Sequence, residues 1–216
     1  MNLGGLQRFS LCDFPGRAAA VVFTQGCNFR CPFCHNGSLI PTDAAGALDE
    51  AELLAFLERR RGQLDGVVVS GGEPTLQSDL EEFLRRVKRL GFEVKLDTNG
   101  SRPDTLRRLL RQALVDYVAM DVKAPLAAYE RLAGRPVDAA ALRESIALIA
   151  GSGVAHEFRT TVVPELLADA ELAALRAELP PGSPHRCQPF RAAAALDPAL
   201  RQAEPARRAP APEPQP

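Results

Sequence analysis

The feature that most constrains the fold is a regular alternation of short apolar runs and amphipathic segments along most of the chain. Runs such as Val67-Val68-Val69 are typical of strands covered on both faces, and the segments between the runs carry leucines at helical spacing. Strands that alternate with helices through short connections predict a parallel sheet with right-handed crossovers. The predicted strands are 18–23, 67–69, 92–96, 117–122, 157–163 and 186–190, and the predicted helices are 49–61, 78–90, 102–112, 139–150 and 169–179.

The length of the chain limits how far such a sheet can close. About six β/α units fit into the sequence, which is fewer than the eight of a closed barrel. Periodicity alone allows a partial barrel or a doubly wound open sheet. Residues 6–16 are expected to form an edge segment and a turn, and Ser78 with Glu81 predicts a capping box. We expect residues 1–203 to form one domain and the Pro- and Ala-rich residues 204–216 to be a disordered tail.

Composition excludes several classes of protein. With 46% hydrophobic and 25% charged residues the chain is typical of a globular protein, and its net charge of −1 does not predict binding to nucleic acid or to an anionic membrane. No apolar run approaches the roughly 20 residues that span a bilayer, and residues 1–10 contain no signal-peptide hydrophobic region. We therefore expect a cytoplasmic protein with reduced thiols.

Three of the five cysteines lie in one short loop after the strand predicted at 18–23. Thiolates as close as Cys27, Cys31 and Cys34 repel one another unless a metal shares their charge. Their odd number, without a mark of secretion, argues against disulfides. A structural zinc site usually has four ligands, for which His35 is the nearest extra candidate. An iron–sulfur cube fits the spacing equally well, and three thiolates would leave one of its irons open to an outside ligand.

Polar residues and glycines follow the carboxyl ends of the other predicted strands, which is where parallel α/β folds bind ligands. Residues 71–73 could form an ordinary turn or a bare backbone that approaches a ligand, and residues 97–99 could cap a helix or line a pocket. Asp121 and Lys123 face the same side of a strand and need a partner or a ligand, whereas Arg159 could be a surface residue. The set consists of Gly71, Gly72, Glu73, Asp97, Thr98, Asn99, Asp121, Lys123 and Arg159.

The cysteine loop resembles that of a known family. Cys27, Cys31 and Cys34, with Phe33 before the last, resemble the cluster loop of the radical S-adenosylmethionine (SAM) enzymes, and the continuation His35-Asn36 is similar to that of the glycyl-radical-enzyme activases. Within these the chain most resembles the anaerobic ribonucleoside-triphosphate reductase activating proteins, over nearly its whole length except the tail. The resemblance implies a partial (β/α)6 barrel that is open on one side.

The resemblance also implies the cofactors and the residues that hold them. A [4Fe-4S] cluster would be bound by the three cysteines, which count as catalytic together with Lys123, and SAM would bind at the open iron. The Asp-Phe-Pro-Gly turn at 13–16 is similar to a lead-in that precedes the first barrel strand of the activases. The implied SAM-binding residues are Phe33, Asn36, Gly71, Gly72, Glu73, Asp97, Thr98, Asn99, Asp121, Lys123 and Arg159.

The activity implied by the resemblance is radical generation. A reduced cluster would cleave SAM, and the 5′-deoxyadenosyl radical would take a hydrogen atom from a glycine of a partner, expected to be an anaerobic ribonucleotide reductase. Flavodoxin or ferredoxin is the expected electron donor. The alternatives are a radical SAM enzyme that acts on a small molecule, similar to 7-carboxy-7-deazaguanine synthase, and a zinc-binding interaction module. Cys12 is expected to be an ordinary, partly buried thiol and Cys187 an ordinary buried one.

Overall fold

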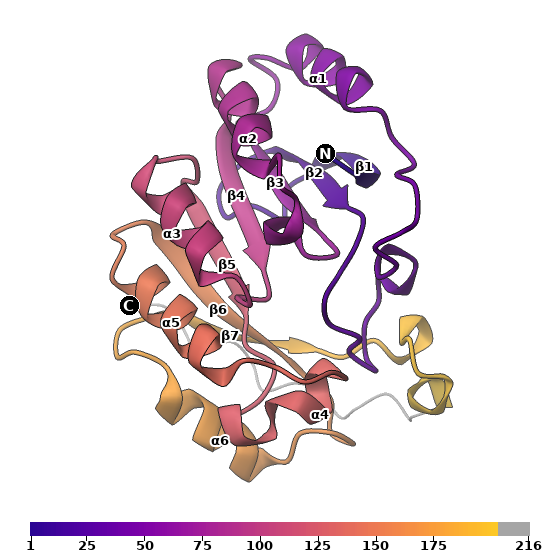
Figure 1. Ribbon diagram of the computed structural model, residues 1–216, viewed down its shortest axis with the longest axis vertical. Coiled ribbons are helices and arrows are strands. Elements are labelled where there is room, and N and C mark those ends of the chain that lie inside the picture. The colour runs from indigo at the N-terminus through magenta and orange to yellow at the C-terminus, as the bar shows by residue number, and fades with distance from the viewer. Residues whose placement is uncertain (203–216) are drawn as a thin grey trace.

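The computed structural model describes residues 1–202, whose strands form one sheet of seven with helices along one of its faces (Figure 1). The strands are hydrogen-bonded to one another in sequence order, and only the first is antiparallel to its neighbour. Their bounds are β1 (Leu3–Ser10), β2 (Ala19–Thr24), β3 (Gly66–Gly71), β4 (Glu93–Thr98), β5 (Tyr117–Asp121), β6 (Ala155–Val162) and β7 (His185–Pro189).

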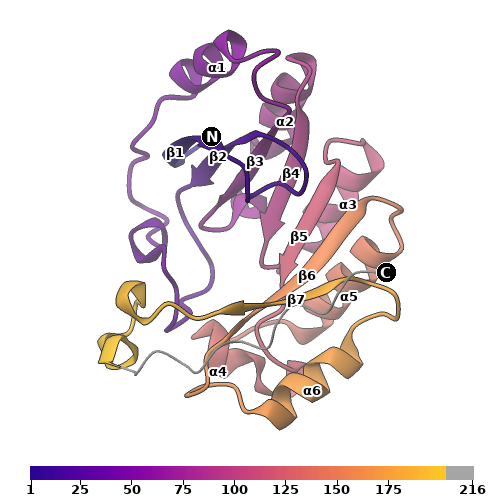
Figure 2. The same cartoon turned by 180° about the vertical axis from the view of Figure 1, so that it is seen from behind.

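Helices connect the parallel strands on one side of the sheet, as the view from behind in Figure 2 also shows. The sheet ends at β1 on one side and at β7 on the other, so the described part of the chain forms an open, partial (β/α)6 barrel, as predicted. The helices are α1 (Glu50–Arg59), α2 (Leu80–Arg89), α3 (Pro103–Arg111), α4 (Tyr129–Ala133), α5 (Ala139–Ala150) and α6 (Asp169–Glu178), and short 3-10 turns lie at Gly37–Leu39, Pro74–Leu76, Leu126–Ala128, Ala192–Ala194 and Pro198–Gln202.

Three details differ from the sequence prediction. The first strand begins at Leu3 rather than at residue 6, and the short helix α4 was not predicted. The capping box at Ser78 is wrong, because α2 begins at Leu80 after Asp79. The carboxylate of Asp79 does not cap the helix and lies 2.6 Å from the amino group of Met1. The proposed domain boundary at 203/204 lies outside the described residues.

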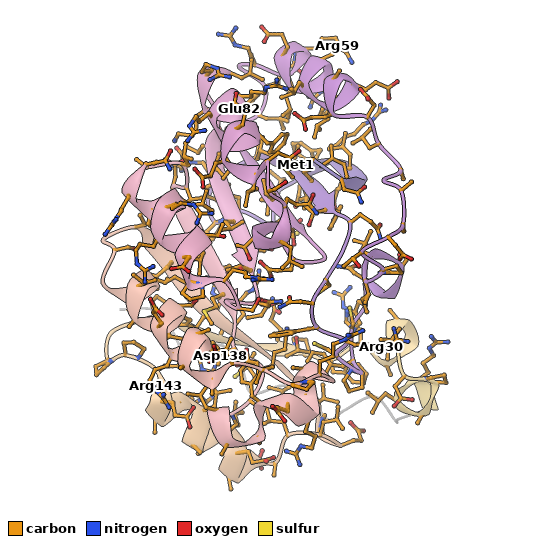
Figure 3. All side chains as sticks on the ribbon, in the orientation of Figure 1. Met1, Arg30, Arg59, Glu82, Asp138 and Arg143 are labelled. Atoms are coloured by element: carbon orange, nitrogen blue, oxygen red, sulfur yellow. The ribbon has the colours of Figure 1, made fainter. Side chains whose placement is uncertain are left out.

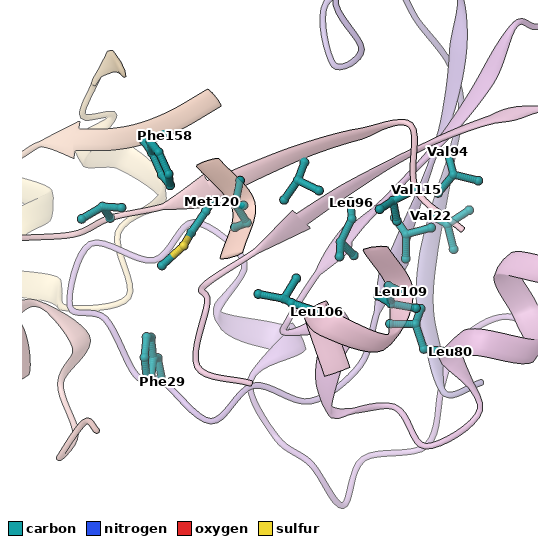
Figure 4. Close-up of a cluster of buried hydrophobic side chains, with 14 of the residues drawn as sticks. Val22, Phe29, Leu80, Val94, Leu96, Leu106, Leu109, Val115, Met120 and Phe158 are labelled. Atoms are coloured by element: carbon teal, nitrogen blue, oxygen red, sulfur yellow. The ribbon is translucent and has the colours of Figure 1, made fainter. Parts of the chain in front are cut away.

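The two faces of the sheet carry different side chains because successive residues of a strand point to opposite sides. Val22, Leu96 and Met120 point toward the helices and pack in the main core, where Leu80 and Leu106 cover them (Figure 4). On the opposite, inner face, a small apolar cluster of Phe14, Ala19, Val21 and Val68 is buried separately. Further along the sheet the inner face becomes polar. The core therefore holds the strands in place, and the inner side of their carboxyl ends can form a site.

None of the helices among the described residues has both the length and the apolar character that crossing a bilayer would require.

Truncation of the core should cost far more stability than truncation of the surface. Leu84 on α2 has no solvent exposure, so Leu84→Ala is expected to lower the free energy of unfolding by about 2–5 kcal/mol. Glu82 lies on the same helix at the surface (Figure 3), and Glu82→Ala should cost far less than Leu84→Ala because its ion pairs are exposed. Urea unfolding followed by circular dichroism measures both, and equal losses would contradict this packing of α2.

Candidate active site

Every residue that the sequence predicted for the site lines one cavity of about 260 Å³. The cavity lies at the carboxyl ends of β2 to β6, where the strands of a parallel sheet present their loops. The structure therefore brings the predicted set together, while the role of each residue stays a prediction. Lining residues that the sequence reasoning did not select are Phe29, Ile40, Ser70, Thr161 and Gln188.

The cysteine loop is fixed by backbone hydrogen bonds that come from distant parts of the chain. The amide of Cys27 donates to the carbonyl of Ile40 at 3.0 Å, which folds the segment after the cysteines back onto β2. The amide of Arg30 donates to the carbonyl of Ala133 at 2.8 Å, at the end of α4. Cys31 is buried, and the other two thiols of the loop are half-buried at the cavity wall.

The last described segment, residues 190–202, packs against the outer side of the cysteine loop (Figure 3, where Arg30 marks the loop). The amide of Asp197 donates to the carbonyl of Pro32 at 2.8 Å, and the rings of His35 and Phe190 stack with their centroids 6.0 Å apart. The loop is therefore held from both sides. Cys12 lies in neither segment and is exposed, so the expectation that it is partly buried is wrong.

The two glycines at the carboxyl end of β3, Gly71 and Gly72, are required by contacts within the chain itself. Gly71 has a φ of +112°, and a Cβ on Gly72 would lie 2.1 Å from the carbonyl oxygen of Gly26. The amide of Glu73 also donates to that oxygen at 2.8 Å. A side chain is thus excluded at Gly72 because the backbone there lies close to the cysteine loop. The predicted contact of these glycines with SAM stays a prediction.

The buried carboxylate of Glu73 connects two of the loops around the cavity. Its Oε1 accepts from the amide and hydroxyl of Thr75 and from the hydroxyl of Thr98, and its Oε2 accepts from the amide of Asn99 at 2.7 Å. Burial raises the pKa of Glu73, and these donors act in the opposite direction. The alternative that residues 97–99 cap the next helix is wrong, because α3 follows Arg102 and no side chain caps it.

Charged side chains on the inner face of β4, β5 and β6 pair in alternating sign. Asp97 lies 3.0 Å from Lys95 on its own strand and 3.4 Å from the Nη1 atom of Arg159. The Nε atom of Arg159 donates to Asp121 at 2.9 Å, and the ammonium of Lys123 lies 3.9 Å from the same carboxylate. Asp121 and Lys123 therefore have the ion-pair partners that the sequence required, and the alternative that Arg159 is a surface residue is wrong because its side chain is mostly buried against Asp121.

These contacts determine the charge states in the pocket. Burial alone would raise the pKa of Asp121, but Arg159 and Lys123 outweigh it and hold that pKa below its usual range. The ammonium of Lys123 also lies over the ring of Phe33, 5.8 Å from its centroid. Lys95 is the charged residue that the sequence reasoning missed, although its position two residues before Asp97 predicts that both face the same side.

The cysteines fit an iron–sulfur cluster better than a single metal ion. Burial, and then the charge of Glu73, raises the pKa of Cys27 to about 12, so a bound cationic group is needed to stabilise its thiolate. Among the described residues, no three side chains of His, Cys, Asp or Glu are placed to hold one ion, which argues against the zinc alternative. In a four-iron cluster each thiolate binds a different iron, so the three sulfurs need not converge.

An open barrel with three thiols and paired charges at the carboxyl ends of its strands defines a class of α/β enzymes with an iron–sulfur site. Residues 21–175 match the sequence model of the radical SAM superfamily. The chain therefore belongs to the radical SAM superfamily, whose members use a [4Fe-4S] cluster and SAM. In this chain Cys27, Cys31 and Cys34 are the residues that would hold the cluster.

Relatives in this superfamily include enzymes that act on proteins and on small molecules. A Methanocaldococcus jannaschii protein whose name describes a glycyl-radical enzyme activating enzyme is 34% identical over 79% of this chain and 72% of its own length. The pyruvate formate-lyase-activating enzyme of Clostridium pasteurianum is 33% identical over 56% of this chain, and the 7-carboxy-7-deazaguanine synthase of Methanopyrus kandleri is 34% identical over 52% of it. The matches span about half the length of these last two relatives.

A solved structure described as native anSMEcpe with bound AdoMet has the same fold. Its TM-score is 0.59 at 18% sequence identity, over 77% of this chain and 49% of that chain. At this identity the similarity concerns the fold alone, and it agrees with a radical SAM partial barrel.

A single methyl group at residue 72 should weaken the cluster site. Gly72→Ala is expected to displace the cysteine loop from β3, with a loss of about 1–3 kcal/mol of unfolding free energy from overpacking and a lower iron content per chain after anaerobic reconstitution. Gly5→Ala is the matched control, because a Cβ there has its nearest contact at 3.9 Å. Iron loading of Gly72→Ala equal to that of Gly5→Ala would show that the loop does not depend on this contact.

Proposed function

We propose that this protein is a glycyl-radical-enzyme activase that cleaves SAM and places the radical on a glycine of a partner enzyme. The proposal is carried by the Methanocaldococcus jannaschii relative, since that match extends over most of both chains. The finer prediction is that the partner is an anaerobic ribonucleotide reductase.

The residues of the cavity fit this chemistry. When bound, the reduced cluster would supply the electron that cleaves SAM, and the resulting radical would abstract the hydrogen atom. The ring of Phe33 offers an apolar surface for the adenine, and Lys123 and Arg159 offer positive charge for the carboxylate of SAM. Asp121 keeps both cations in place, so the chain's own contribution is to orient the cofactor and to exclude water.

The open side of the barrel favours a peptide loop as the substrate. The sheet ends at β7 without pairing to β1, and Gln188 of β7 lines the cavity. An extended segment of a partner could therefore reach the pocket from that side. In the part of the chain that the structure describes, little lies beyond the barrel that could form a separate small-molecule site.

The electron donor and the compartment belong to the same proposal. Reduction of a low-potential cluster requires a donor such as flavodoxin or ferredoxin. All five cysteines are free thiols, which fits a reducing compartment and hence the cytoplasm expected from the sequence.

One other function has a specific observation in its favour. The match to 7-carboxy-7-deazaguanine synthase supports a radical SAM enzyme that acts on a small molecule. That match spans 52% of the relative, against 72% for the Methanocaldococcus jannaschii protein, so we place the activase first.

The test is radical transfer to a partner under anaerobic conditions. Reconstituted protein, SAM and dithionite are incubated with anaerobic ribonucleotide reductase, with pyruvate formate-lyase as a second partner, and electron paramagnetic resonance measures the glycyl radical. We expect a radical on the reductase only, and its complete loss in Cys31→Ser because one cluster ligand is removed. Cys12→Ser is the matched control and should keep full activity, since that thiol is exposed and outside the cavity.

The possible outcomes distinguish the activase function from the choice of partner enzyme. A radical on pyruvate formate-lyase alone would overturn the choice of partner but keep the activase. Cleavage of SAM without a radical on either protein, together with turnover of a deazaguanine precursor, would favour the small-molecule enzyme.

A further inference from the structure

Lys95 is a buried lysine below the cavity that the proposed chemistry does not use. Its side chain is 3% exposed, and its ammonium lies 3.0 Å from the Oδ1 atom of Asp97. It also donates to the carbonyl oxygen of Asp13 at 2.5 Å and lies 5.9 Å from the ring centroid of Tyr117. A buried ammonium loses its hydration, so these partners are needed to compensate the loss.

Asp97 depends on Lys95 more than on its other neighbours. The Oδ2 atom of Asp97 accepts from the hydroxyl of Ser70 at 3.1 Å and from Arg159 at 3.4 Å. The Oδ1 atom is buried, accepts no well-aligned hydrogen bond, and has the ammonium of Lys95 as its charged partner. Without Lys95 this carboxylate oxygen would be buried with its charge uncompensated.

Loss of the Lys95 charge would change the ion pairs at the cavity wall. Arg159 is shared between Asp97 and Asp121, with the shorter contact, 2.9 Å, to Asp121. If Lys95 did not neutralise Asp97, the guanidinium would be attracted away from Asp121 and toward Asp97. Lys123, which pairs with Asp121, would then lose a fixed partner at its side of the cavity.

We propose that Lys95 is a positioning residue for SAM, which holds Asp97 so that Arg159 and Asp121 keep their places at the cavity wall. Through the carbonyl of Asp13 it also connects the turn before β2 to this network. The inference rests on the assignment of this cavity to SAM and is independent of which partner enzyme accepts the radical.

The test compares two lysines that both form ion pairs. Lys95→Met keeps the length of the side chain but removes its charge, and we expect SAM to bind about tenfold more weakly, which is within the coupling found among residues of one network. Lys88→Met is the matched control, because Lys88 pairs with Asp116 at 2.7 Å, outside the cavity. Anaerobic titration calorimetry on cluster-loaded protein measures the Kd of SAM, and iron content measures loading separately.

A double-mutant cycle distinguishes positioning from a merely structural role. If Lys95 acts through Asp97, then Lys95→Met in an Asp97→Asn background should change the Kd by less than about twofold. The KM for SAM in reductive cleavage should rise in Lys95→Met while kcat changes little. An equal loss of affinity in both backgrounds, or a lower iron content with unchanged affinity, would overturn the proposal.

A milder variant keeps the proposal testable if Lys95→Met does not fold. Tyr117→Leu removes the aromatic ring beside the ammonium without leaving a buried charge, and about a two- to threefold weaker binding of SAM is expected, the range of a cation–π contact. Unchanged affinity in this variant would count against the role of Lys95. Failure of the unmodified protein to bind SAM would instead contradict the assignment of the cavity.

Discussion

The structure of the site depends on one buried carboxylate, that of Glu73. Its oxygens accept hydrogen bonds from the loops after β3 and β4, and its own amide donates to the cysteine loop after β2. One residue therefore joins the three loops that form one side of the cavity. Both carboxylate oxygens are engaged within the chain, and these contacts, with that of the amide, place Thr98, Asn99 and the cysteine loop. A charge-assisted acceptor suits this role, since leaving several backbone donors unpaired in a buried place would be costly.

The inner face of the sheet shows why a partial barrel can hold charged groups in its interior. Alternate residues of each strand face the helices and the inner side of the sheet. The inner side carries the apolar cluster around Val21 and Val68, and further along it carries Lys95, Asp97 and Arg159. Each of these charges has an opposite charge on the same or the adjacent strand, which offsets the cost of desolvation. Lys123 and Arg159 are the cations at the cavity wall, and they are the groups there that a carboxylate ligand could contact.

Local patterns predicted the elements well, and the errors come from contacts between distant residues. The helix predicted at 139–150 agrees with α5 at both ends, because leucine spacing and the cap at Asp138 lie within a few residues of each other. The predicted capping box at Ser78 is absent because α2 begins at Leu80 after Asp79, whose carboxylate pairs with the amino group of Met1 rather than capping the helix. The site residues were predicted as a set because parallel strands gather their carboxyl ends. The contacts that hold these residues in place were not predicted. The contact of Gly72 with Gly26 and the packing of residues 190–202 on the cysteine loop depend on tertiary structure.

The relatives that match this chain differ in the activities that their names give, although they belong to one superfamily. A relative named as an activating enzyme and one named as a deazaguanine synthase each match about half of this chain, and the superfamily match, residues 21–175, contains the cysteine loop and the carboxyl ends of β2 to β6. If the predicted residues orient SAM, they serve the same purpose whatever the substrate is, and we expect the choice of substrate to come from the remaining border of the cavity. In the described part of this chain that border includes the edge strand β7, which contributes Gln188, and residues 190–202 follow β7 and pack on the cysteine loop. Both lie after residue 175, where the superfamily match ends, as expected if this border changes with the substrate while the shared pocket does not.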